Sequence, residues 1–282
     1  NTFYVKAAGN AGYYAKQDIK VGLESMSASN VTLVFEGNYN SGGNSITSGT
    51  SFELTINNNQ IQFGQNLVNG ITFTPEQRSN TISIKSLNNT RRYRGIIEFK
   101  VINNKLLAIN TVNIEDYLKG VVGIEMSNYF PIEALKAQAV AARNYTLYNK
   151  GKFNSYGYDL TDDTRSQAYA GYNAALTNVI RAVDETLGIT ILYNGNIIEA
   201  VYSANNGGYV EPAENVWGFI HPYYSGKKDD FDDYTKYQNS RSYDWTKDYS
   251  IHDIDAILKS KNLIGQTDSF KSIQFNTITK YF

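Results

Sequence analysis

Cysteine is absent from this chain, and histidine, methionine, tryptophan and proline are scarce. Without cysteine there can be no disulfide, no thiol nucleophile and no zinc site built on thiolates. The two histidines, His221 and His252, are too few for a histidine-rich metal site and lack the motif context of a serine hydrolase. Since no P-loop and no dinucleotide fingerprint is present either, we expect neither a metal nor another cofactor.

Excess charge and long apolar runs are also missing. The net charge of −1 gives no general attraction to nucleic acid or anionic membrane, so we expect no nucleic-acid partner. No apolar run reaches the roughly 18 residues that a transmembrane helix needs. The chain begins at Asn1, and a removed signal or a membrane anchor before this residue remains an open expectation.

The composition is that of a folded protein. The chain has 282 residues, of which 41% are hydrophobic and 19% charged, so it can bury a substantial core. Its length fits one large domain or two ordinary ones.

Residues 1–110 are predicted to be rich in β-strands. Several runs alternate apolar with polar side chains, which is the pattern of a half-buried strand; these runs are 31–35, 52–56, 60–63, 81–84 and 96–101. Asparagine-rich and glycine-rich turns separate them. The longest such stretch, 38–49, is expected to be an exposed loop. This β-rich region is either a separate domain or part of a sheet shared with the rest of the chain.

The pattern changes to helical at Asn113. Asn113 is the expected N-cap, with Asp116 as a capping-box partner, and this helix should end near Glu125. Pro131 suits the first turn of a second, alanine-rich helix. A third helix is predicted over 173–186, followed by a hairpin of strands 189–193 and 197–202 around Asn194-Gly195. The order of strands, helices, hairpin and mixed C-terminal region predicts an α+β fold, with 111–282 as its second region.

Glu125 is the first candidate for catalysis. It lies in the apolar stretch 121–126, and burial among apolar neighbours raises the pKa of a carboxyl group. The negative end of the preceding helix acts in the same direction. A carboxylic acid that keeps its proton near neutral pH can act as a general acid. The competing interpretation is a glutamate that faces solvent at the end of a helix.

Three groups of residues are further candidates for substrate binding. Lys136, Gln138 and Arg143 lie on the second helix, where Lys136 and Arg143 share a face, although the local pattern alone favours a solvated helix face. The polar loop 162–167, which contains Asp163 and Gln167, either binds substrate or is only a turn. The segment 203–208 places Ser203 before Gly207 and Gly208, a pair that permits close backbone approach or a positive φ.

Together these motifs resemble the SpoIID/LytB family, named for stage II sporulation protein D and an amidase enhancer. The likeness is strongest from Ile109 to Arg143, and it includes EDYL at 115–118, GVV at 120–122, Glu125-Met126 and ALKAQAVAAR at 134–143. It continues through QAYAG at 167–171 and TLG at 186–188, and returns at Tyr202-Ser203 with Gly207-Gly208.

This resemblance implies a lytic transglycosylase that cuts peptidoglycan glycan strands between MurNAc and GlcNAc and leaves a 1,6-anhydro-MurNAc end. The family's catalytic glutamate corresponds to Glu125, which protonates the leaving oxygen and then serves as base for the 6-hydroxyl of the substrate. The implied pocket residues are Lys136, Gln138, Arg143, Asp163, Gln167, Ser203, Gly207 and Gly208. Strands without stem peptides are the expected substrate, and the expected location is extracellular or associated with the cell wall.

The chain departs from the family pattern in two places. Some sporulation members bind zinc through Cys and His near the segment that corresponds to 162–167, where this chain has Arg165 and Ser166, so we expect no zinc there. Family members usually continue through a further β-rich stretch, so a C-terminal segment is expected beyond Phe282. Two alternatives stay open: a non-catalytic wall-binding module that enhances a partner amidase, and a two-carboxylate hydrolase in which Asp162 or Asp163 supplies the second group.

Overall fold

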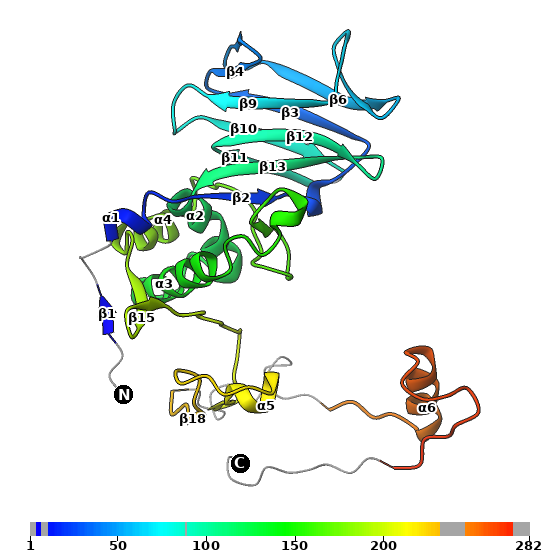
Figure 1. Ribbon diagram of the computed structural model, residues 1–282. Helices are drawn as coiled ribbons and strands as arrows, with labels where there is room; N and C mark the ends of the chain where they lie inside the picture. The colour runs from blue at the N-terminus through cyan, green and yellow to red at the C-terminus, as the bar shows by residue number, and fades with distance from the viewer. Residues whose placement is uncertain (1–3, 7–10, 88, 232–245, 273–282) are drawn as a thin grey trace. The chain divides into compact units, whose positions relative to one another are not determined.

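The computed structural model describes residues 4–6, 11–87, 89–231 and 246–272 (Figure 1). The chain forms two compact units, Asn1–Tyr202 and Ser203–Phe282. The mixed α+β class is confirmed, with strands predominating in the N-terminal part. Residue 110, where the sequence suggested a boundary, lies inside strand β13 of the first unit.

Two largely antiparallel sheets make up most of the first unit. One has the order β11-β10-β3-β6-β7-β8, formed by Asn89–Arg94, Thr81–Ser86, Asn30–Glu36, Ser51–Asn57, Gln60–Phe63 and Asn66–Val68. The other has the order β14-β2-β13-β12-β9-β4-β5, formed by Leu160–Thr161, Asp18–Gly22, Lys105–Asn113, Ile96–Ile102, Gly70–Pro75, Tyr39–Ser41 and Asn44–Ile46. The parallel pairing of β14 with β2 joins the segment after the helices to the N-terminal strands.

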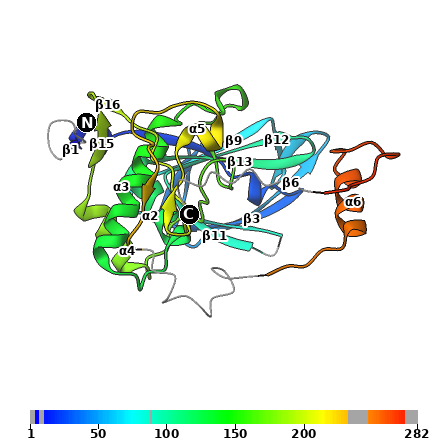
Figure 2. The same cartoon turned by 90° about the horizontal axis from the view of Figure 1, so that it is seen from below.

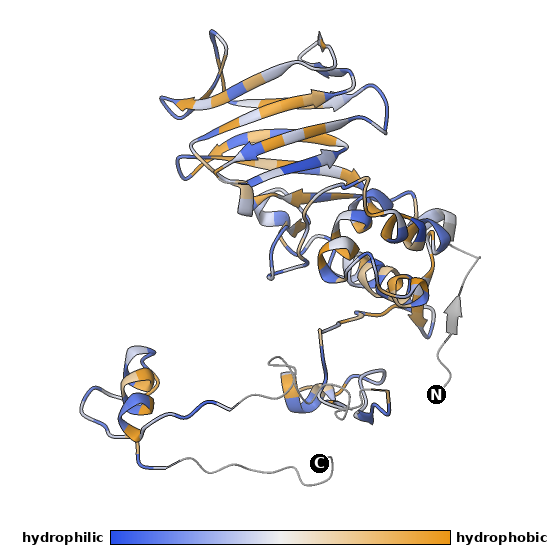
Figure 3. Ribbon diagram, turned by 180° about the vertical axis from the view of Figure 1, so that it is seen from behind, coloured by the Kyte–Doolittle hydropathy of each residue, from blue (hydrophilic) through white to orange (hydrophobic). Residues whose placement is uncertain are grey.

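The core lies between these sheets. Along β3, Val31, Leu33 and Phe35 are buried in alternation with more exposed residues, and Figure 3 shows the same alternation of colour along the strands. The ring of Phe35 contacts that of Phe73 from the other sheet at 5.2 Å between centroids. Strand periodicity therefore places one face of each sheet in a shared apolar interior.

Tight asparagine turns set the register of the hairpins. Asn103 and Asn104 both adopt positive φ between the paired residues Ile102 and Lys105. Such left-handed two-residue turns match the twist of the strands, and asparagine tolerates this conformation well. The pair Asn58-Asn59 does the same between β6 and β7.

The prediction of an exposed loop over 38–49 was wrong. This segment contains the short strands β4 and β5, and β4 also pairs with β9. Tyr39 and Ile46 are buried in the core. Two apolar anchors in a polar stretch are thus enough to fix a hairpin on the edge of the sheet.

The helices gather at one end of the sheets (Figures 1 and 2). Helix α2 covers Ile114–Glu125, α3 covers Ile132–Tyr148 and α4 covers Thr177–Glu185. The Asn113 side chain caps α2 by accepting from the Glu115 backbone N–H at 3.1 Å, as predicted. The capping-box role of Asp116 was wrong, because its carboxylate instead pairs with Arg78 and Arg94.

The third helix and the hairpin are shorter than predicted. Helix α4 begins at Thr177 rather than Asn173. Strand β15, Thr190–Tyr193, pairs on one side with β16, Asn196–Ile197, and on the other with β1, Tyr4–Lys6. The described chain after Ile197 continues to Tyr202 without strand pairing, which leaves this segment available to line a cavity.

The remaining elements are short. The first unit also contains α1, Ala11–Tyr14, and two 3-10 turns, Glu24–Met26 and Asn154–Tyr156. The second unit contains β17, Tyr209–Val210, which pairs with β18, Lys227–Lys228, together with helices α5, Ala213–Trp217, and α6, Ile251–Ser260. In the part of the chain that the structure describes, no helix has the length and apolar character needed to cross a membrane.

Candidate functional site

Glu125 ends helix α2 at the edge of an open cavity of about 300 Å³. The cavity draws residues from four parts of the first unit, namely the end of α2, the last turn of α3, the loop before residue 169 and the segment before Ser203. Besides Glu125, it is lined by Tyr145, Thr164, Ser166, Gln167, Ala168, Val201 and Tyr202. Its polar groups other than Glu125 are hydroxyls and one amide, which suit a ligand rich in hydroxyl groups.

Gln167 is held in place from several sides. Its side chain is buried, and its Oε1 accepts from Thr146 Oγ1 at 2.8 Å. Its Nε2 donates to the Tyr202 hydroxyl at 2.8 Å. Gln167 therefore fixes Tyr202 against α3, in the wall of the cavity that Glu125 also lines.

Two tyrosines that line the cavity have raised pKa values. Burial raises the pKa of Tyr202, and the nearby Glu125 carboxylate raises it further. Burial likewise raises the pKa of Tyr145. Both phenols consequently keep their protons at neutral pH and can donate hydrogen bonds.

The predicted apolar burial of Glu125 was wrong. The Glu125 side chain is exposed, and the adjacent Ile124 is 52% exposed, whereas Val121 and Val122 are fully buried. Residues that are neighbours in a helical sequence point to different faces, so an apolar sequence context did not imply an apolar environment. Exposure leaves this carboxyl accessible to a large ligand.

Arg143 is not placed to bind substrate, contrary to the prediction. Its side chain is fully buried, with Nε and Nη2 donating to the two carboxylate oxygens of Glu115 at 3.0 and 2.7 Å. Nη1 donates to the Ile189 carbonyl at 3.0 Å. Arg143 therefore ties α2, α3 and the start of the hairpin together, which is a structural role.

The other two candidates on α3 do not line the cavity either. Lys136 pairs with Glu133 and with Glu185 of α4, at 2.8 and 2.6 Å. Gln138 has a buried Nε2 that finds no hydrogen-bond partner among the described residues. Gln138 precedes Tyr145 by seven residues, so the two residues lie on the same side of α3. Substrate binding by Gln138 therefore stays a proposal.

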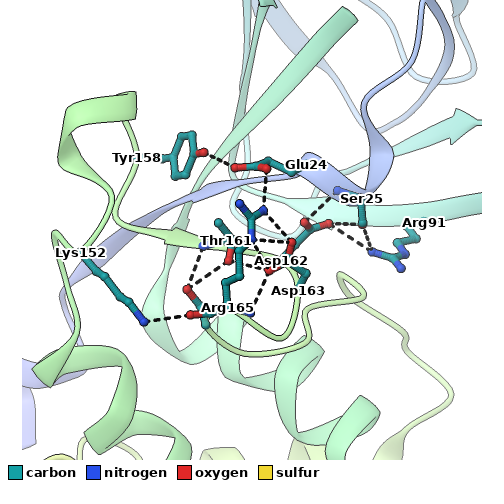
Figure 4. A network of polar contacts seen from close by, with 10 residues as sticks. Glu24, Ser25, Arg91, Lys152, Tyr158, Thr161, Asp162, Asp163 and Arg165 are labelled. Carbon is teal, nitrogen blue, oxygen red and sulfur yellow. Dashed lines mark hydrogen bonds and ion pairs between the residues drawn. The ribbon is translucent and has the colours of Figure 1, made fainter. Parts of the chain in front are cut away.

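The loop 162–167 divides between the cavity and a separate polar network (Figure 4). Asp163 accepts hydrogen bonds from Thr161 and Arg165. The pKa of Asp163 is lowered, mainly by the hydrogen bond from the Arg165 side chain. Asp162 is buried, accepts from Ser25 and pairs with Arg91 at 3.3 Å. Burial raises the pKa of Asp162. Neither aspartate is among the residues that line the cavity of Glu125.

Ser203, Gly207 and Gly208 belong to the second unit. Both glycines adopt positive φ, at 68° and 86°, as one of the two interpretations anticipated. Their backbone N–H groups donate to the side chains of Asn205 and Asn206, at 2.7 and 2.9 Å. Their participation in substrate binding stays a prediction.

Sequence reasoning missed two aromatic members of the cavity, Tyr145 and Tyr202. A signal was present for each, since Tyr145 shares a helix face with Gln138 and Tyr202 adjoins the Ser203 motif. Among the described residues, no cluster of three acidic, histidine or cysteine side chains is placed to hold a metal ion.

Comparisons with known proteins agree with the resemblance. A family model described as "Stage II sporulation protein" matches residues 102–193, which contain α2, α3, α4 and β15. The amidase enhancer of Bacillus subtilis (strain 168) is 36% identical over 191 residues, covering 65% of this chain and 25% of that protein. Stage II sporulation protein D of the same organism is 32% identical over 140 residues, covering 44% and 41%.

A further relative is an uncharacterized protein of Brachyspira hyodysenteriae, 42% identical over 135 residues, which cover 48% of this chain and 37% of that protein. The matched regions of the curated relatives span between 25% and 50% of their full lengths. The stretch that the family model matches is continuous and includes Glu125 and the helices around it. Residues 102–193 therefore match the family of stage II sporulation proteins, and the similarity to an amidase enhancer and to stage II sporulation protein D agrees with the resemblance to the SpoIID/LytB family.

Proposed function

We propose that this protein is a lytic transglycosylase that cuts peptidoglycan glycan strands between MurNAc and GlcNAc, outside the cytoplasmic membrane. The observation that carries the proposal is the position of Glu125, an exposed carboxylate at the end of α2 in the wall of a polar cavity. The family assignment and the names of the sporulation and amidase-enhancer relatives support a role at the cell wall.

The composition of the cavity favours a reaction that needs one carboxylate. An ordinary glycosidase uses two, one as acid and one as nucleophile or base. Of the described residues that line this cavity, Glu125 alone carries a carboxylate. Asp162 and Asp163 are engaged with Arg91 and Arg165, which argues against the two-carboxylate hydrolase.

The proposed reaction uses Glu125 twice. First, its carboxyl proton passes to the glycosidic oxygen, and the bond from that oxygen to C1 of MurNAc breaks. The 6-hydroxyl oxygen of the same MurNAc then bonds to C1, and its proton returns to Glu125, so that no water is consumed. A bound strand would exclude water from this exposed side chain, which strengthens its hydrogen bonds to the reacting atoms.

The surroundings of Glu125 leave room for a polymer. Ile124 lines a neighbouring cavity of about 430 Å³ that includes Gly120 and Tyr172. Two consecutive residues of α2, Ile124 and Glu125, thus line two different cavities of the first unit. A glycan strand requires binding groups on both sides of the bond that is cut, and the presence of two cavities at this end of α2 supports such binding.

A second candidate function is a non-catalytic module that binds glycan and enhances a wall amidase. The similarity to a protein named amidase enhancer favours it specifically. In this case the cavity of Glu125 would bind a strand without cutting it, and the partner would be the amidase.

Incubation of purified, peptide-free glycan strands with the wild-type protein and with Glu125→Gln separates the two functions. Mass spectrometry should detect anhydro-MurNAc ends from the wild type alone. If both proteins bind strands and neither yields such ends, the enhancer function replaces the transglycosylase.

A further inference from the structure

A third cavity lies in the first unit, with a lining that shares no residue with the cavity of Glu125. Its volume is about 370 Å³, within the range of roughly 300–1,000 Å³ typical of small-molecule sites. Its walls come from the tip of the β12–β13 hairpin, the 3-10 turn at 154–156 and the loop after β14. The residues relevant to binding are Glu24, Lys105, Phe153, Tyr156, Tyr158 and Arg165.

Three aromatic rings form one wall of this cavity. The ring of Tyr158 is nearly parallel to those of Phe153 and Tyr156, with interplanar angles of 26° and 25° and centroid distances of 6.1 Å. Tyr158 is buried, whereas Tyr156 is 65% exposed. Phe153 and Tyr156 are tilted by 48° to each other, so the exposed ring of Tyr156 offers the flat face on which the C–H face of a pyranose can pack.

The polar groups beside this wall are held in fixed positions (Figure 4). The Tyr158 hydroxyl donates to Glu24, and the guanidinium of Arg165 pairs with Glu24 and with Asp163. Burial and the hydrogen bond to Glu24 raise the pKa of Tyr158, so its hydroxyl remains a donor. The Glu24 carboxylate is thereby a preorganised acceptor for the hydroxyl groups of a ligand.

Lys105 adds a cation at the cavity wall. It begins β13, its side chain is exposed, and none of the ion pairs among the described residues involves it. The two other charged groups of the lining, Glu24 and Arg165, are paired with each other. An ammonium without an ion-pair partner among the described residues favours a ligand that combines a sugar ring with one negative charge.

We propose that this cavity is a second saccharide-binding site that takes an N-acetylmuramic acid residue of a peptide-free glycan strand. The pyranose ring packs on Tyr156, its hydroxyls donate to Glu24, and the lactyl carboxylate binds Lys105. That carboxylate is free only where the stem peptide has been removed, so the site selects stripped strands. The choice of glycan rests on the proposed function.

Photoaffinity labelling of the full chain tests this site apart from catalysis. The probes are a photoreactive GlcNAc–MurNAc tetrasaccharide without peptide and a photoreactive chitotetraose, which has no lactyl carboxylate. The Glu125→Gln variant serves as the parent, so that bound strands are not cut. Peptide mapping then distinguishes label at residues 153–158 from label at residues 199–202 beside Glu125.

The variants make specific predictions. Tyr156→Ala should weaken labelling of 153–158 by both probes about tenfold. Lys105→Met should weaken labelling by the muramic probe alone, whereas Lys105→Arg and Tyr156→Phe should retain it. Tyr13→Ala and Lys85→Met are matched controls, since Tyr13 is also 65% exposed and Lys85 is an exposed strand lysine.

Label confined to 199–202 would overturn the second site and leave the proposed function standing. Label at 153–158 that a free stem peptide displaces, and chitotetraose does not, would overturn its assignment to a sugar. If both places are labelled but the wild-type protein forms no anhydro ends, the second site stands and the transglycosylase function is contradicted.

Discussion

Arg143 on α3 and Glu115 on α2 form a bidentate ion pair that is buried from solvent, with side-chain exposures of 0% and 2%. Glu115 Oε1 also accepts from the Gly188 backbone N–H at 3.2 Å, and Arg143 Nη1 donates to the carbonyl of Ile189. The ion pair thus connects α2, which ends at Glu125, with α3. Through Gly188 and Ile189 it also connects both helices to the chain that leads into β15. Its hydrogen bonds satisfy both charges inside the core.

Arg143→Met should lower the free energy of unfolding by about 3–5 kcal/mol, because it leaves the Glu115 carboxylate buried without its partner. Urea unfolding followed by circular dichroism measures the change. The double variant Arg143→Met with Glu115→Leu should recover much of the loss, since both buried charges are then removed. A variant that unfolds like the wild type and only binds glycan more weakly would instead support the original prediction of a substrate contact.

Tyr202→Phe should slow strand cleavage about tenfold with little change in fold. The substitution removes the hydroxyl that accepts from Gln167 Nε2 and lies beside Glu125, and the loss of one such hydrogen bond corresponds to about a factor of ten. The rate of release of soluble fragments from glycan strands measures it. Tyr148→Phe, on the same helix as Tyr145 but outside the cavity lining, is the control; equal rates for both variants would exclude the role of the Tyr202 hydroxyl.

Tyr129→Ala should weaken glycan binding by about 1 kcal/mol without changing stability. Tyr129 is 92% exposed and follows Glu125 by four residues. Its loop is rigidly placed, because Asn128 Oδ1 accepts from the backbone N–H groups of Asn178 and Val179 at 3.0 and 3.1 Å and so caps α4.

The kinetic signature of this loss is a raised KM with kcat nearly unchanged, as expected for a contact made equally in the ground and transition states. Tyr129→Phe keeps the ring and should behave as the wild type. An unchanged KM in Tyr129→Ala would show that the exposed ring makes no contact with the strand.

Local sequence signals were sufficient for most of the secondary structure. The alternation in β3, the Asn113 cap and the Asn194-Gly195 turn each act over a few residues, and each is present in the structure. The hairpin at 39–46 was missed because polar composition concealed its two buried anchors, Tyr39 and Ile46.

The site was harder to predict because its parts meet only through tertiary packing. Glu125 and Gln167 were both proposed from sequence, and the structure brings them to one cavity. Arg143 was assigned to the substrate because its partner Glu115, 28 positions earlier, could not be identified from spacing. Likewise, the fixed position of Tyr202 depends on Gln167, 35 positions away.

The origin of the oxygen in the new glycan end tests the central claim most directly. Peptide-free strands are cut by the wild-type protein in water labelled with heavy oxygen, with Glu125→Gln as the control, and the ends are analysed by mass spectrometry. We predict anhydro-MurNAc ends without label from the wild type and no new ends from Glu125→Gln. Reducing ends that carry the label would show that water attacks C1, and would contradict the transglycosylase account.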